Sequence, residues 1–154
     1  MKAPGARTPQ AVLFACGQNS VRSPMAASLL QRMFPQGLYV RSAGVKKGEL
    51  DPFAVAVMAE LGQDISTHKP ITFEELDDWE GLNFDLIITL SPEAHHKALE
   101  LTRTLAADVE YRPTHDPTGT DRNREQKLQA YREVCDGLSL RIRRRFSKVG
   151  AASG

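Results

Sequence analysis

The sequence has 154 residues, with 41% hydrophobic and 25% charged side chains and a formal net charge of +1. This length and composition are typical of one globular domain with its own core, and they exclude a disordered chain. The near balance of charges argues against binding of nucleic acid or anionic membranes through bulk electrostatics. The longest apolar run, residues 11–16, has six residues and is too short for a membrane span or a signal peptide. The two cysteines, Cys16 and Cys135, indicate no disulfide framework, and we expect a soluble cytoplasmic protein.

Four short apolar runs predict the buried strands of a parallel sheet: Ala11–Ala15, Leu38–Val40, Leu86–Leu90 and Val109–Tyr111. Helix-start signals lie between them, where a capping side chain precedes a proline in Ser23-Pro24, Asp51-Pro52 and Ser91-Pro92. Thr72 and Glu75 have the spacing of a capping box. These signals predict helices over about residues 24–34, 52–61, 73–79, 92–105 and 124–148.

The last of these helices carries one apolar stripe, whose members recur at helical spacing: Leu128, Tyr131, Val134, Cys135, Leu138 and Ile142. The basic run at residues 141–145 is predicted to be a solvated helix end. Strand and helix alternate along the chain, which predicts an α/β fold of three layers, αβα, with a four-stranded parallel sheet and helices on both faces. One domain is expected over residues 11–149, between flexible tails at residues 1–10 and 150–154.

The loop after the first predicted strand is Cys16-Gly17-Gln18-Asn19-Ser20-Val21-Arg22-Ser23. It stands where ligands bind in such folds, outside the carboxyl end of a strand. If the loop curls, its backbone N–H groups converge on one anion, helped by the dipole of the helix that follows. Gly17 and Asn19 tolerate the left-handed backbone that a curl requires. The loop is therefore predicted to bind a phosphate-like oxyanion.

Three side chains of this loop suit nucleophilic chemistry on such an anion. Arg22 offers a planar fork that binds two phosphate oxygens at once. Cys16 lies at the floor of the positive cup, which stabilises its thiolate, and a thiolate held below a tetrahedral oxyanion is a nucleophile aimed at phosphorus. Ser23 is placed to donate a hydrogen bond to that sulfur.

A cysteine followed by an arginine six positions later is a weak signal alone, because the chain contains this spacing twice. The second match, Cys135 and Arg141, lies within the last predicted helix, where amide groups are already bonded and cannot converge on an anion. Cys135 is therefore predicted to be a buried member of the apolar stripe. The strand before Cys16 and the proline after Ser23 distinguish the first match.

Asp116 lies in a proline-flanked loop after the fourth predicted strand, so we expect it at the same sheet edge as Cys16. Cleavage of a phosphate ester needs a proton for the departing oxygen and then removal of a proton from water, and one carboxyl can do both. Pro117 restricts Asp116 to an extended backbone, which helps to fix its aim. The residues alone leave two interpretations open, a general acid or the start of a turn.

Several separate motifs of the sequence resemble those of the low molecular weight protein tyrosine phosphatases, a family that shares its fold with the thioredoxin-coupled arsenate reductases. In chain order the motifs are Val12-Leu13-Phe14-Ala15-Cys16, Asn19, Arg22-Ser23-Pro24-Met25-Ala26, Ser42-Ala43-Gly44, Gly62-x-Asp64-Ile65-Ser66-x-His68, Phe84-Asp85-Leu86-Ile87 and Asp116-Pro117. The likeness extends from Ala11 to about Phe146, nearly the whole chain.

The resemblance implies a phosphomonoester hydrolase in which Cys16 is the nucleophile, Arg22 the phosphate clamp and Asp116 the general acid. It implies substrate contacts from the whole loop, namely Gly17, Gln18, Asn19, Ser20, Val21, Arg22 and Ser23. It also implies that Asn19, Ser23, Ser42 and His68 hold the loop in shape. The expected substrate is a phosphorylated protein or a small phenyl phosphate, with inorganic phosphate or another oxyanion as ligand. We expect no cofactor, no metal, and no nucleic-acid or membrane partner.

Three positions depart from the family pattern. Val21 stands where members often have a second cysteine, Thr118-Gly119 stand where phosphatases usually have aromatic residues, and the loop at residues 45–50 has no aromatic residue. An arsenate reductase therefore stays an alternative. The resolving cysteines that thioredoxin-coupled members carry after the third strand are missing, so such an enzyme would use Cys135 or an external thiol such as glutathione, mycothiol or glutaredoxin. A non-catalytic oxyanion-binding module is the third possibility.

Overall fold

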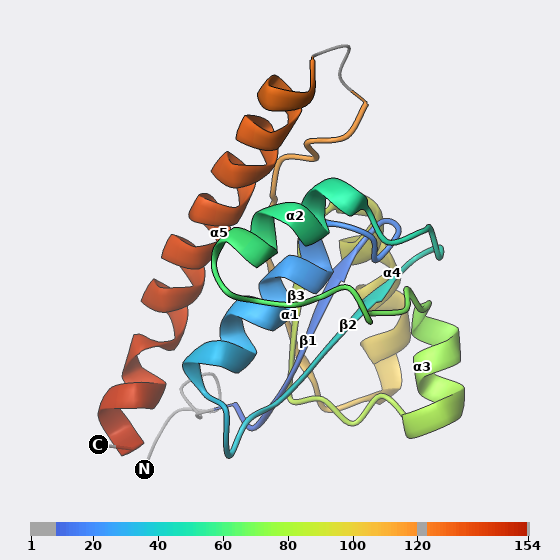
Figure 1. Ribbon diagram of the computed structural model, residues 1–154. Coiled ribbons are helices and arrows are strands. Elements are labelled where there is room, and N and C mark those ends of the chain that lie inside the picture. Colours follow the sequence, from blue (N-terminus) through green and yellow to red (C-terminus); the bar gives the residue numbers. More distant parts are fainter. Residues whose placement is uncertain (1–8, 120–122, 154) are drawn as a thin grey trace.

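A four-stranded parallel sheet lies at the centre of the molecule (Figure 1). The structure is a computed structural model that describes residues 9–119 and 123–153. Its strands follow the order β2-β1-β3-β4, with bounds β1 Ala11–Cys16, β2 Tyr39–Gly44, β3 Leu86–Thr89 and β4 Asp108–Tyr111. Phe14 in the middle of β1 pairs with Ser42 of β2 and Ile88 of β3. The predicted sheet is confirmed, and its carboxyl edge collects the loops after all four strands.

Helices cover both faces of the sheet, so the predicted three-layer α/β fold is confirmed. The helices are α1 Arg22–Met33, α2 Pro52–Glu60, α3 Phe73–Glu80, α4 Pro92–Leu101 and α5 Arg124–Ser153. Side chains of β1 alternate between the two layers, because Val12, Phe14 and Cys16 pack with α1, α2 and α5, whereas Leu13 and Ala15 pack with α3 and α4. Burial on both faces explains why β1 is apolar without alternation.

The predicted starts of α2, α3 and α4 are confirmed by their caps. Asp51 and Ser91 accept hydrogen bonds from the backbone of the first helical turn, at 2.8 Å and 3.3 Å. Thr72 and Glu75 form both bonds of a capping box. Helix α1 is present as predicted, but the predicted cap at Ser23 was wrong, since α1 begins at Arg22 and Val21 precedes it without a side-chain cap. Ser23 lies inside the helix because its hydroxyl is used by the loop that precedes α1.

Three elements end more than two residues from their sequence-based bounds. Strand β2 continues to Gly44 although Arg41 and Ser42 interrupt its apolar pattern. Helix α4 ends at Leu101 and a 3-10 helix follows at Thr102–Thr104, where the Thr102 hydroxyl bonds back to the carbonyl of Ala98 at 2.8 Å. Helix α5 continues to Ser153 rather than ending near residue 148, because alanines favour the helix and no proline stops it.

Residues 1–8 and 154 of the two predicted tails lie outside the described residues. The apolar stripe of α5 is buried as predicted, and Phe146 extends it by one turn. Across residues 9–119 and 123–153, no helix is both long enough and apolar enough to cross a membrane.

Candidate active site

The loop at residues 16–23, here called the Cys16 loop, curls around a small cavity at the carboxyl end of β1. Its carbonyl groups point away from that cavity. Four of them accept hydrogen bonds from backbone N–H groups of residues 45–51, with donor–acceptor distances from 2.9 to 3.2 Å: Val45 to Cys16, Lys46 to Gly17, Gly48 to Gln18 and Asp51 to Ser20. The carbonyl of Asn19 lies 3.3 Å from Nε2 of His68.

This arrangement turns the N–H groups of the Cys16 loop toward the cavity, because the C=O and N–H of one peptide unit point in opposite directions. Among the described residues, no partner accepts a hydrogen bond from the backbone N–H of any residue from 17 to 21. Asn19 has the left-handed backbone that the curl needs, with φ of 56°. The amino end of α1 follows at once and adds its unpaired N–H groups and its dipole. The predicted anion cradle therefore has the required geometry.

Asn19 is fully buried and is the centre of a hydrogen-bond network that holds the curl. Its Nδ2 donates to Oγ of Ser23 and to Oγ of Ser42, both at 2.9 Å. Its Oδ1 accepts from the backbone N–H of Ile71 at 3.0 Å and lies 3.0 Å from Nε2 of His68. The structure thus brings together the four side chains for which the family resemblance implies a supporting role.

His68 contributes to this network as a donor. Its Nε2 faces two oxygens of Asn19, so this nitrogen carries a proton. Burial lowers the pKa of His68. The hydrogen bond with Asn19 raises this pKa and the charge of Arg41 lowers it, both by less than burial does. The neutral ring with its hydrogen on Nε2 satisfies both observations, which makes His68 a structural partner of Asn19.

The Cys16 sulfur is buried at the base of the cradle, and its Sγ lies 3.0 Å from Oγ of Ser23. The Ser23 oxygen already accepts a hydrogen bond from Asn19, so the hydroxyl hydrogen remains for donation to the sulfur. A hydrogen bond to a sulfur stabilises its anionic form. Ser23 therefore serves the Cys16 loop instead of capping α1.

Gly44, at the end of β2, is packed directly against the Cys16 loop. A Cβ atom there would lie 2.8 Å from the backbone nitrogen of Asn19 and 2.9 Å from the carbonyl carbon of Gln18. Both atoms belong to the backbone, so neither can move without distorting the curl. This close approach is the physical reason for glycine in Ser42-Ala43-Gly44.

Arg22 and Asp116 meet at the cavity above Cys16, which has a volume of ≈ 100 Å³. The Nη2 of Arg22 and the Oδ2 of Asp116 are 3.9 Å apart. The other oxygen of Asp116 accepts hydrogen bonds from the N–H and the hydroxyl of Thr118, at 3.0 and 2.8 Å. One carboxylate oxygen thus stays directed toward the cavity, and the side chain is 51% exposed to solvent.

Glu93 and Thr118 also line this cavity, and the sequence did not predict either of them. Glu93 comes from the first turn of α4, which begins after β3 at the same sheet edge. A Cβ atom on Gly17 would lie 2.7 Å from Oε1 of Glu93, so a larger residue there would require this carboxylate to shift. The available signal was topological, because any helix that starts at the carboxyl edge brings its first turn near the ligand site.

A second hollow of ≈ 490 Å³ adjoins the cradle and shares Gln18, Ser20 and Thr118 with it. Its walls include Phe53 of α2 and Tyr131 of α5, whose ring centroids are 5.5 Å apart. The hydroxyl of Tyr131 donates to Asp51 at 2.6 Å, and burial together with this carboxylate raises the pKa of Tyr131. Aromatic walls are therefore present beside the cradle, although the loops that usually supply them in the family lack aromatic residues.

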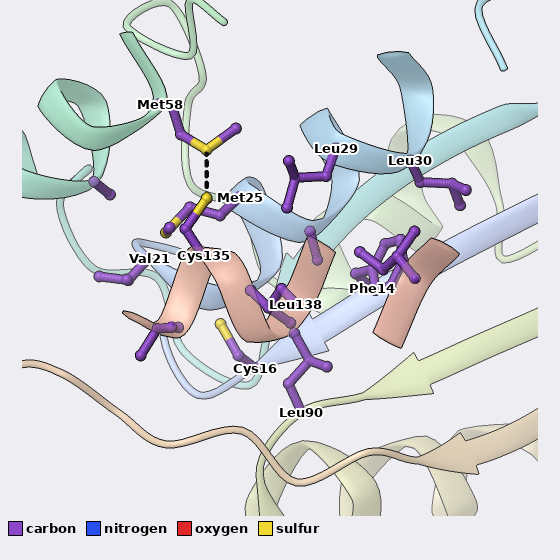
Figure 2. Close-up of a cluster of buried hydrophobic side chains, with 14 of the residues drawn as sticks. Phe14, Cys16, Val21, Met25, Leu29, Leu30, Met58, Leu90, Cys135 and Leu138 are labelled. Carbon is purple, nitrogen blue, oxygen red and sulfur yellow. Dashed lines mark hydrogen bonds between the residues drawn. The ribbon is translucent and has the colours of Figure 1, made fainter. Parts of the chain in front are cut away.

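Cys135 lies in the core between α5 and α2, away from this chemistry. Its sulfur is 3.8 Å from Sδ of Met58, and Figure 2 shows it directed toward that side chain rather than toward Cys16. Burial raises the pKa of Cys135 to about 11. The prediction of a buried stripe cysteine is confirmed by its exposure of 1%.

No group of three or more His, Cys, Asp or Glu side chains within residues 9–119 and 123–153 is arranged to hold a metal ion. Besides the backbone N–H groups of the loop, the cavity is lined by polar residues that carry one guanidinium, one sulfur, two carboxylates, one amide and two hydroxyls: Arg22, Cys16, Glu93, Asp116, Gln18, Ser20 and Thr118. This set suits a tetrahedral oxyanion, with a carboxyl available for proton transfer.

Fold and site together define a class of α/β proteins that hold a cysteine beneath a curled backbone loop after the first strand. The family model described as "low molecular weight phosphotyrosine protein phosphatase" matches residues 11–152. The chain belongs to this family.

Relatives within this fold include both arsenate reductases and phosphatases. An arsenate reductase from Bacillus licheniformis is 32% identical over 90% of this chain and 96% of its own length. A glutaredoxin arsenate reductase from Synechocystis sp. is 27% identical over 90% of this chain and 97% of its own. Among solved structures, a low molecular weight protein tyrosine phosphatase from T. tengcongensis aligns with a TM-score of 0.72 and 25% identity, covering 90% of this chain and 99% of that one.

Proposed function

We propose that the protein is a phosphomonoester hydrolase of the protein tyrosine phosphatase type, acting through a cysteinyl-phosphate intermediate. The observation that carries this proposal is the outward bonding of the Cys16 loop carbonyls. It leaves the N–H groups of residues 17–21 without an acceptor among the described residues, beside a cavity above the Cys16 sulfur. Such donors stabilise the charge of a phosphoryl group as it is transferred.

In the first step the Cys16 thiolate attacks phosphorus, forming an S–P bond as the bond from phosphorus to the ester oxygen breaks. The carboxyl of Asp116 gives its proton to the departing oxygen. Arg22 and the loop N–H groups hold the three remaining phosphoryl oxygens. Ser23 keeps a hydrogen bond on the sulfur while its charge changes.

In the second step Asp116, now a carboxylate, takes a proton from water as that water attacks phosphorus. The S–P bond breaks, inorganic phosphate forms and the Cys16 thiolate is restored with its hydrogen bond from Ser23. The same carboxyl thus returns to its acid form without a second residue.

The hollow beside the cradle supports an aryl ester as substrate. An aromatic ring attached to a phosphate in the cradle would extend toward Phe53, whose ring lies at the hollow's wall. A phosphorylated tyrosine side chain or a small phenyl phosphate has this shape. A phosphorylated protein is therefore the proposed substrate class.

Arsenate reduction is the second candidate, favoured by the arsenate reductases among the relatives, such as those from Synechocystis sp. and Bacillus licheniformis. It needs a second thiol to attack the adduct between Cys16 and arsenic. The chain has only one other cysteine, Cys135, which is buried and has a raised pKa. A reductase would therefore depend on an external thiol.

The two candidates are separated by parallel assays on the same preparation. We expect hydrolysis of para-nitrophenyl phosphate without added thiol, and no consumption of reductant when arsenate is supplied with glutathione, mycothiol or glutaredoxin. Thiol-dependent arsenate turnover with negligible ester cleavage would replace the phosphatase by the reductase. Binding of phosphate with neither activity would leave an oxyanion-binding module.

A further inference from the structure

Two arginines from distant parts of the chain bind the loop that carries Asp116, here called the Asp116 loop (residues 112–119). Arg22 of the Cys16 loop donates from Nη1 to the carbonyl of Thr114 at 3.1 Å. Arg141 of α5 donates from Nη1 to the carbonyl of Pro113 at 2.9 Å and from Nη2 to Oγ1 of Thr114 at 2.6 Å. Thr114 is therefore fixed from two sides, two positions before Asp116.

Thr114 is also held by a backbone hydrogen bond, two residues before Asp116. Its N–H donates to the carbonyl of Leu90 at 3.0 Å, which continues the pairing of β4 with β3 beyond the strand ends. Beyond it, the Asp116 side chain has hydrogen bonds only to Thr118 within the described residues, and it is half exposed. The direction of the carboxyl thus depends on where Thr114 is held.

Arg141 is half-buried, and its contacts are those of a tether rather than of an ion pair. Within the described residues no carboxylate pairs with it, whereas Arg145, one turn later, has a two-pronged contact with Glu110. Burial and the nearby charge of Arg112 lower the pKa of Arg141. Both of its hydrogen-bond acceptors are neutral oxygens of the Asp116 loop. The guanidinium therefore uses its hydrogen bonds to fix this loop instead of to bind a charge partner.

We propose that Arg141 is a positioning residue for the general acid: through Pro113 and Thr114 it holds the Asp116 loop so that the carboxyl meets the departing ester oxygen. Arg141 does not touch the substrate. This inference rests on the proposed function and adds to it a residue of the last helix.

The test compares two esters that differ in how much they need an acid. Phenyl phosphate has a poor leaving group and depends on proton donation, whereas 2,4-dinitrophenyl phosphate leaves with little protonation. For Arg141→Met we expect kcat/KM for phenyl phosphate to fall about 10- to 100-fold, because the acid is displaced. The value for the dinitrophenyl ester should change by less than about threefold, and inhibition by inorganic phosphate should not change.

Two matched variants accompany this measurement. Arg143→Met removes an exposed arginine from the same helix and should leave both esters unaffected. Arg141→Lys keeps the charge but can reach only one acceptor well, so its loss for phenyl phosphate should be intermediate. Equal losses for both esters in Arg141→Met, or no loss for either, would overturn the positioning role.

Thr114→Val tests the same contact from the other side and serves if Arg141→Met fails to fold. It removes the Oγ1 acceptor and should reproduce the ester selectivity of the loss. In the double variant with Arg141→Met, the fold-loss in kcat/KM for phenyl phosphate should be smaller than the product of the two single fold-losses. The reason is that both substitutions remove the same interaction. Independent, fully multiplicative losses would contradict the proposal. A wild-type protein that cleaves neither ester would instead overturn the proposed function.

Discussion

The two cysteines of this chain are each followed by an arginine six positions later, and the two regions have opposite surroundings. Cys16 and Arg22 line one cavity, because the backbone between them curls. Cys135 and Arg141 lie on a straight helix, where a separation of six residues is about 1.7 turns and directs the side chains apart. There the sulfur faces Met58 in the core, while the guanidinium reaches the Asp116 loop.

The contrast shows what a cysteine needs in order to act as a nucleophile. At Cys16 the backbone donors are unpaired within the described residues and converge, whereas the amides around Cys135 are bonded along α5. Ser23 gives the first sulfur a hydrogen bond, and burial raises the pKa of the second to about 11. The same two residue types at one spacing therefore have different chemistry.

The largest expected effect comes from exchanging the sulfurs one at a time. Cys16→Ser should lower kcat for para-nitrophenyl phosphate by roughly 10³-fold or more, since the nucleophile is lost. Phosphate or vanadate should still bind, because the cradle remains. Cys135→Ala should keep activity per folded molecule and lose about 1 kcal/mol of stability through a small cavity. Steady-state kinetics measure the activity of the two variants, and thermal unfolding measures their stability. Equal activity losses in the two variants would contradict the assignment of Cys16 alone as the nucleophile.

The general acid is tested by Asp116→Asn, which keeps the shape and the acceptor for Thr118. Hydrolysis of phenyl phosphate should slow by roughly 10²–10⁴-fold, as expected for loss of a positioned acid. The cavity contains a second carboxylate, so Glu93→Gln is the matched control. Should Glu93→Gln show the larger loss, the proton donor would have to be reassigned to α4.

The support of the Cys16 loop is tested at Asn19. Asn19→Gly and Asn19→Ala both remove four side-chain contacts, and each should cost about 1–3 kcal/mol of unfolding free energy. Alanine is additionally strained at φ of 56°, so the glycine variant should be the more stable by roughly 1 kcal/mol. Denaturant unfolding compares them. An alanine variant as stable as wild type would show that the network does not hold the curl.

The smallest expected effect is a pH dependence of stability at His68. Because its pKa is lowered in the folded state, the unfolded chain binds more protons as pH falls below the ordinary histidine pKa of about 6.5. Stability should therefore decrease from there down to the folded-state pKa, and remain level below it. His68→Gln should lack this contribution. The measurement is the free energy of unfolding of wild type and of His68→Gln as a function of pH across that window. Parallel curves for the two proteins would contradict a buried neutral ring.

Much of the fold was predictable because its signals are local. The caps at Asp51, Thr72 and Ser91 act within one turn, and the apolar run of β1 marks a strand buried on both faces. Ser23 was predicted as a cap because the local pattern matches one, but its hydroxyl is engaged by Cys16 and Asn19. Local chemistry could not reveal that competing partner.

The site was predictable where motifs carry it and hidden where distant segments meet. Glu93, Phe53 and Tyr131 reach the cavity or its neighbouring hollow from three different helices. Arg141 belongs to a basic run that was interpreted as a solvated helix end, and this was wrong for Arg141 and Arg145, which contact the Asp116 loop and Glu110. Arg143 and Arg144 are exposed as predicted. Such contacts follow from where α5 lies once it packs against α1 and α2, which no spacing in the sequence encodes.

The central claim is that phosphorus becomes bonded to the Cys16 sulfur during turnover. Acid quenching of a reaction with a phenyl phosphate, followed by peptide mass spectrometry, tests it directly. The account predicts one phosphoryl group on the peptide that contains Cys16 in wild type, and none there in Cys16→Ala under the same quench. Ester hydrolysis that proceeds without any phosphoryl group on Cys16, or with the group on another residue, would contradict it.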